Sequence, residues 1–298
     1  MTGQEGSLAP RESRLVVNGV SLCIFEWPGD GPPVFFIHAT GHHARCWDGV
    51  VRRMPGCHAY AIDLRGHGRS DKPEPPYRWR SFAEDVAAVA DSLDLRQAVG
   101  VGHSMGGYVV TFAAALRPER FGGLALVDPT IPSPDRPFQP RNGEHPVARR
   151  RDRWDSPQEM FDRFRDRPPF NTWTDEALVD YCVGGLLAAP DGKGYVLACP
   201  PRIEASMYGS AISHEVFDHL DKIRGPVHVL RARPRTPSDT PDSFGPSVTW
   251  PGLAGHLAQG MDFPMPEHSH FIPQEAPEKV AAHILQVRAK VGAQASRP

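Results

Sequence analysis

A serine between two glycines forms the stretch most suited to chemistry. Gly102, Ser104 and Gly106 have the spacing Gly-x-Ser-x-Gly, with a second glycine at 107. A valine-rich run ends at Gly102, and an alanine-rich segment, long enough for several helical turns, continues to Pro118. This order predicts a strand, a sharp turn and a helix, from which the serine side chain projects. We therefore predict that Ser104 is a catalytic nucleophile.

A serine hydroxyl needs a histidine to take its proton. His268 and His270 lie in a loop, residues 266–273, that follows the last predicted strand. His270 is the predicted base, because a small residue before it and an aromatic residue after it would let the loop reach Ser104. We interpret His268 as a surface imidazole. His42 and His43 are assigned no role beyond lining the entrance.

Acyl transfer also needs N–H donors for the oxyanion that forms on the attacked carbonyl. The backbone N–H of Met105 follows the nucleophile and lies at a predicted helix N-terminus. The second donor should come from the loop after the apolar run 34–37, and we expect it to be the N–H of Thr40.

The other elements must bring these groups together. Strands are predicted at 34–37, 58–62, 98–102, 124–127, 227–230 and 261–265, with helices at 47–54, 82–93, 247–259 and 277–291. A hairpin of residues 15–17 and 21–26 precedes them. The alternation predicts an α/β fold with a mostly parallel sheet and helices on both faces. His38, Asp63, Ser104 and Asp128 then share the rim at the carboxyl ends of the strands.

The alternation stops between residues 131 and 222, where prolines, arginines and aromatic residues are dense. We interpret 131–222 as a mainly helical lid, with helices near 158–164 and 175–187, inserted into a core of residues 1–130 and 223–298. The arginines within 149–153 are interpreted as solvated surface. The alternative is that they recognise an acidic group.

Bulk properties exclude several classes of partner. The chain has 298 residues and a net charge of −2, which gives no electrostatic case for nucleic acid or an anionic membrane. We expect no signal peptide and no membrane span. Five scattered cysteines predict reduced thiols in a cytoplasmic protein. We predict a small-molecule substrate without a cofactor or metal, and the oligomeric state stays open.

In combination, these motifs resemble the α/β-hydrolase superfamily of lidded enzymes. The resemblance rests on residues 102–107, the loop 63–70 (Asp-Leu-Arg-Gly-His-Gly-Arg-Ser), the His-x-x-Gly of 38–41 and the histidine loop before the last helix. It implies an α/β-hydrolase fold and a triad completed by an acid.

The position of that acid departs from the family pattern. Most relatives carry it just after the strand that is here 227–230, where this chain has Arg235, which cannot stabilise an imidazolium. Asp128 could replace it, as in members that moved the acid to that strand end. Otherwise, Asp239 or Asp242 would bend back from a longer loop. We favour Asp128, and interpret Asp63 as holding its own loop.

The expected function is a serine hydrolase that cleaves a small to medium carboxylic ester through an acyl-enzyme. The same groups could cleave a thioester, a lactone or a carbon–carbon bond next to a ketone. A non-catalytic relative that binds a ligand is the alternative from another class. Epoxide and haloalkane chemistry in this superfamily uses an aspartate at the elbow, so Ser104 argues against both.

Overall fold

The computed structural model describes residues 9–135, 145–208, 214–240 and 243–295. Its main feature is an eight-stranded sheet in the order β1-β2-β4-β3-β5-β6-β10-β11. The strands are β1 (Arg11–Val17), β2 (Val20–Trp27), β3 (Asp30–Ile37), β4 (Cys57–Asp63), β5 (Ala98–His103), β6 (Phe121–Val127), β10 (Pro226–Arg231) and β11 (Gln259–Pro264). All neighbouring pairs from β4 to β11 are parallel, whereas β1 and β2 are antiparallel additions. The predicted mostly parallel sheet is confirmed.

The hairpin at the edge of the sheet follows from two residues. Asn18 and Gly19 have φ values of 49° and 75°. Both central residues of a type I′ turn need a positive φ, and this turn matches the twist of the two strands that it joins. β1 and β2 therefore pair in the predicted hairpin.

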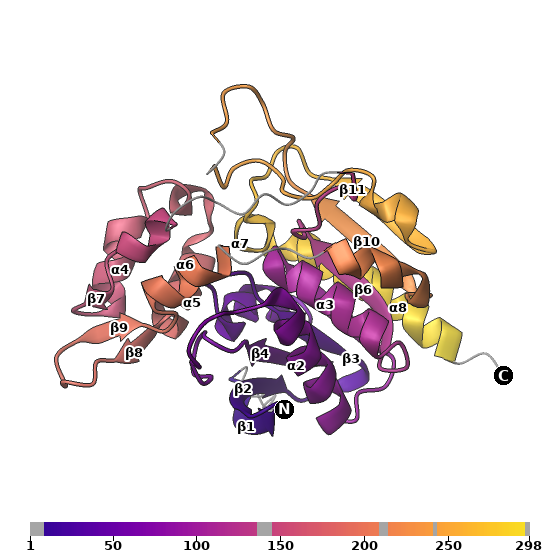
Figure 1. Cartoon of the computed structure of the whole chain (residues 1–298), viewed down its shortest axis with the longest axis horizontal. Coiled ribbons are helices and arrows are strands. Elements are labelled where there is room, and N and C mark those ends of the chain that lie inside the picture. Colours follow the sequence, from indigo (N-terminus) through magenta and orange to yellow (C-terminus); the bar gives the residue numbers. More distant parts are fainter. Residues whose placement is uncertain (1–8, 136–144, 209–213, 241–242, 296–298) are drawn as a thin grey trace, which may run out of the picture.

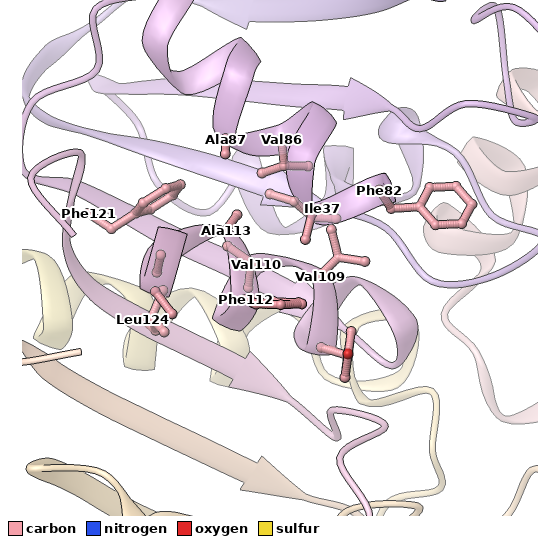
Figure 2. Close-up of a cluster of buried hydrophobic side chains, with 14 of the residues drawn as sticks. Ile37, Phe82, Val86, Ala87, Val109, Val110, Phe112, Ala113, Phe121 and Leu124 are labelled. Atoms are coloured by element: carbon pink, nitrogen blue, oxygen red, sulfur yellow. The ribbon is translucent and has the colours of Figure 1, made fainter. Parts of the chain in front are cut away.

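Helices cover both faces of the sheet (Figure 1). On one face, α2 (Trp79–Ser92) and α3 (Met105–Leu116) pack on Phe35 and Ile37 of β3. Figure 2 shows side chains of both helices gathered around Ile37. On the other face, α1 (Asp48–Val51) and α8 (Pro277–Ala295) belong to the cluster that holds Val34 and Phe36. Successive side chains of residues 34–37 therefore point to opposite faces of the sheet and are buried on both, as expected of a central strand.

The segment between β6 and β10 lies beside the sheet (Figure 1). Its elements are η2 (Pro146–Arg149), β7 (Arg153–Trp154), α4 (Pro157–Phe164), η3 (Phe170–Thr172), α5 (Asp175–Gly184), β8 (Leu186–Ala188), β9 (Tyr195–Leu197), α6 (Pro201–Tyr208) and η4 (His214–Lys222). The prediction of a mainly helical segment did not include the small sheet β7-β9-β8. α5 ends at Gly184 rather than at residue 187, because Leu186 begins the pairing with β9.

The predicted helix over 247–259 is wrong. Within this range, only η5 (Leu253–His256) is helical. Two other short helices, η1 (Ala44–Trp47) and α7 (Ile272–Glu275), lie elsewhere in the chain. Pro251 and Gly252 interrupt any helix that begins earlier. The residues before them bond to Asp128 instead, as described below.

Two further observations concern membrane-spanning helices and the state of the cysteines. Among the described residues, no helix is both long enough and apolar enough to cross a membrane. All five cysteines are buried free thiols.

The close approach of strand and helix at the serine turn predicts a stability effect. A β-carbon at Gly106 would overlap the backbone carbonyl oxygens of Ile37 and His38. We expect Gly106→Ala to lower the free energy of unfolding by about 1–3 kcal/mol, measured by urea denaturation. Gly292→Ala, where a β-carbon meets open space, is the matched control and should leave stability unchanged or slightly raised. Equal stability of the two variants would contradict this packing argument.

Candidate active site

Ser104 lies between β5 and α3 in a strained backbone conformation. Its φ is 55° and its ψ is −120°, a region that costs a non-glycine residue about 1–3 kcal/mol. The end of β6 and the residues just after it hold Ser104 there. Its N–H donates to the carbonyl of Val127 at 3.1 Å, and its carbonyl accepts from the N–H of Thr130 at 2.9 Å. The predicted strand–turn–helix around this serine is therefore present.

His270 and Asp128 lie together, although 142 positions separate them in the chain. His270 Nδ1 donates to Asp128 Oδ2 at 2.6 Å, and the two residues are 4 % and 0 % exposed. Because Nδ1 carries this proton, Nε2 of the neutral ring is an acceptor. The Nε2–H of His103 donates to the backbone carbonyl of His270 at 2.8 Å and so fixes the loop from the nucleophile side.

Asp128 is held by a shell of donors. Its carboxylate accepts from the N–H of Ala232, the N–H of Val248 and the hydroxyls of Ser247 and Thr249. Burial opposes its charged form, but the hydrogen bond and charge of His270 and the bonds from Ser247 and Ala232 outweigh it. The pKa of Asp128 therefore lies below its usual 3.8.

The other candidate acids are placed differently. Asp239 Oδ1 accepts from the Arg233 guanidinium at 2.6 Å, which holds the pKa of this carboxyl well below its usual range. Arg235 donates to the carbonyl of Thr240. Asp242 lies outside the described residues. In the predicted family, the acid usually follows the strand that corresponds to β10. In this chain, Ala232 at that strand end instead donates its N–H to Asp128.

Two further residues singled out in the sequence have structural contacts. Asp63 accepts from the N–H groups of Ala44 and Arg69 at 2.7 and 2.8 Å, so it joins two loops at the rim. The ring nitrogens of His268 lie 3.4 Å from Glu267 Oε1 and 3.3 Å from Glu275 Oε2.

Thr40 and Met105 offer backbone N–H groups beside the serine. Their side chains touch, with Thr40 Oγ1 donating to Met105 Sδ at 3.3 Å. In the part of the chain that the structure describes, neither N–H donates to a protein acceptor. Thr40 and Ser104 line the same cavity. This arrangement can hold an oxyanion.

The Ser104 hydroxyl has a partner that no sequence pattern predicts. Its Oγ lies 3.2 Å from Thr130 Oγ1. Across the described ranges this is its one side-chain hydrogen bond, so none joins it to His270. Catalytic hydrogen bonds are often long before substrate binds. Thr130 follows Asp128 by two positions, but no spacing rule points to it.

Buried histidines hold the rim without carrying charge. Burial lowers the pKa of His38 to about 4 and of His42 to about 3. The Nε2 of His38 accepts from the N–H of Leu64, and the Nε2 of His67 accepts from the N–H of Gly41. His42 is buried and lines the cavity, and its Nε2 has no partner among the described residues. His43 does not line the cavity, and its Nε2 bonds the carbonyl of Tyr181.

Ser104 and His270 open into a cavity of about 590 Å³. The segment between β6 and β10 supplies much of its wall, including Phe170, Trp173 and Tyr181. Its apolar character and size suit a small or medium-sized organic molecule.

A family model described as the alpha/beta hydrolase family matches residues 34–283. The chain belongs to this family. It is 36% identical over 152 residues to a non-heme chloroperoxidase of Streptomyces lividans, covering 50% of this chain and 51% of that protein. It is 35% identical over 129 residues to an esterase of Mycobacterium tuberculosis, covering 43% and 42%. The chain thus spans about half, or less, of the length of the curated relatives it matches.

The fold agrees with solved members. The crystal structure of E-2-(acetamidomethylene)succinate hydrolase superposes with a TM-score of 0.69 at 20% identity, covering 93% of this chain and 98% of that one. This α/β-hydrolase likeness confirms the predicted fold class.

The buried His270–Asp128 pair predicts a pH-dependent contribution to stability. Because the folded pKa of Asp128 is lowered, its stabilisation is complete above the unfolded value of 3.8 and disappears as pH falls through the folded value. We expect Asp128→Asn to cost about 3–5 kcal/mol near neutral pH. This gap from wild type, measured by urea denaturation, should narrow as the pH falls below about 4.

Asp166→Asn, at a side chain that is 88 % exposed, is the control and should show no such gap. A gap that widens toward acid would contradict the lowered pKa.

Proposed function

We propose that this chain is a serine hydrolase that cleaves a small to medium carboxylic ester through an acyl-enzyme. The single observation that carries the proposal is the buried His270–Asp128 hydrogen bond at the rim where Ser104 projects. An imidazole held in the Nδ1–H form presents Nε2 as a base, which is what a serine nucleophile needs.

In the first half of the reaction, Ser104 Oγ forms a bond to the ester carbonyl carbon and its proton passes to His270 Nε2. The hydroxyl must first turn from Thr130 toward the imidazole. The N–H groups of Thr40 and Met105 hold the oxyanion, each worth about 3–4 kcal/mol. When the tetrahedral intermediate collapses, the C–O bond to the alcohol breaks and the imidazolium returns its proton to the leaving oxygen.

In the second half, His270 takes a proton from water, and the resulting hydroxide attacks the acyl carbon. Collapse breaks the bond to Ser104 Oγ, which regains the proton from the imidazolium, and the acid is released. Asp128 stays ionised throughout and stabilises the imidazolium that forms twice. Its low pKa and its donor shell suit this role.

The substrate class is proposed from the cavity wall. Phe170, Trp173 and Phe271 present apolar surface to the space beside the nucleophile, which favours an apolar acyl or alcohol part. We also propose that residues 131–222 act as a lid, because elements from this segment close one side of the cavity. The esterase relative supports ester chemistry by analogy.

Replacing the nucleophile tests the proposal. We expect wild type to hydrolyse a short-chain chromogenic ester, and Ser104→Ala to lose at least about 10³-fold in kcat. A fluorophosphonate should label wild type at Ser104 and leave the variant unlabelled. No hydrolysis and no labelling in wild type would instead support a ligand-binding relative without catalysis. Thioesters, lactones and vinylogous diketones in the same assay would identify a different scissile bond.

The choice of acid is tested by two matched variants. Asp128→Asn keeps the size of the side chain but removes the charge that stabilises the imidazolium, so kcat should fall about 10³–10⁴-fold. Asp239→Asn, which breaks the contact with Arg233 on a loop outside the cavity, should change kcat less than about twofold. The opposite ranking of the two variants would reject Asp128.

A further inference from the structure

The cavity wall contains an ion pair that has no part in the proposed triad. Arg150 follows η2, and Glu204 lies on α6, and both line the cavity that contains Ser104. Arg150 Nη1 is 3.0 Å from Glu204 Oε2. Arg150 therefore differs from the solvated surface arginine that the sequence suggested.

The pair leaves hydrogen-bonding capacity unused. Glu204 is 4 % exposed, yet its Oε2 has no hydrogen-bond partner among the described residues, because the contact with Arg150 is close but poorly aligned. Arg150 Nε is likewise buried and has no partner there. Burial raises the pKa of Glu204, although the charge of Arg150 opposes this. Buried polar atoms without partners carry a cost that a ligand can relieve.

Glu204 also lies next to the proposed oxyanion donor. Gly41 has a φ of 73°, and a β-carbon there would overlap the Glu204 carboxylate. The carboxylate therefore rests against the backbone directly after Thr40. Glu204, Thr40 and Ser104 therefore line one cavity, with the carboxylate against the residue that follows Thr40.

Charge decides which ligand group fits. Arg150 and Glu204 together are neutral, so an anion attracted by the guanidinium would also meet the carboxylate. An alkyl group would leave the unpaired atoms of both side chains without partners. A group with one donor for Glu204 and one acceptor for Arg150 satisfies both.

We propose that Arg150 and Glu204 form a specificity subsite for an uncharged amide group of the substrate. The amide N–H donates to the Glu204 carboxylate, and the amide carbonyl accepts from the Arg150 guanidinium. As a statement about substrate, this rests on the proposed hydrolase function. As a statement about binding, it can be tested without turnover.

The test compares three ligands of similar shape that differ at one polar group. Benzamide has a donor and an acceptor, acetophenone has only an acceptor, and benzoate is an anion. Their dissociation constants are measured by titration calorimetry on the full chain carrying Ser104→Ala. We expect benzamide to bind at least about tenfold more tightly than either other ligand, since only benzamide satisfies both partners.

Substitution of the carboxylate should reverse the charge preference. Glu204→Gln keeps the shape but leaves Arg150 as an unpaired cation, so benzoate should bind at least about tenfold more tightly than it does with Glu204 present. Arg151→Met, which breaks the exposed pair with Glu159 in the same segment, is the matched control and should leave all three constants unchanged. Thermal denaturation of each variant checks that it is folded.

Equal affinities for benzamide and acetophenone would overturn the subsite. Benzoate as the tightest ligand with Glu204 present would overturn the amide class and indicate an anion site. If wild type cleaves no ester but benzamide retains its preference, the proposed function fails and the subsite stands. If Ser104-dependent ester hydrolysis is found without the preference, the subsite fails alone.

Discussion

The arrangement of this site depends on one short contact, the hydrogen bond from His270 Nδ1 to Asp128 Oδ2. It joins the loop after β11 to the end of β6, and burial makes either partner costly to leave alone. The backbone around it serves the same contact. Thr130 holds the turn at Ser104, and His103 holds the carbonyl of His270, so Ser104 and His270 are tied to one rim.

The end of β10 carries no carboxylate beside His270, and Asp128 at the end of β6 occupies that place. The end of β10 donates the N–H of Ala232 to Asp128, and residues 247–249 provide the remaining donors. A carboxylate surrounded by donors stays ionised in a buried place. The loop between β10 and β11 therefore positions Asp128, whereas the loop's own carboxylate at Asp239 pairs with Arg233.

Most of the sheet could be predicted from the sequence, because the apolar runs are short, valine-rich and separated by helical patterns. The contact between His270 and Asp128 was also within reach, since both residues follow strand ends. The irregular loop at 247–252 was not, because its geometry depends on bonds to Asp128, which lies 121 positions before Thr249. The pairing of Arg150 with Glu204 was hidden for the same reason: one residue lies in an arginine run and the other on a helix, with no periodicity linking them.

Phe271 connects the aromatic cavity wall to the loop that carries His270. Its ring centroid lies 5.2 Å from that of Trp173, and Phe271 directly follows His270 in the chain. The segment between β6 and β10 therefore packs directly against the loop that carries His270. Displacement of Trp173 would remove packing from the residue directly after His270, so the covering segment and the position of the imidazole are coupled.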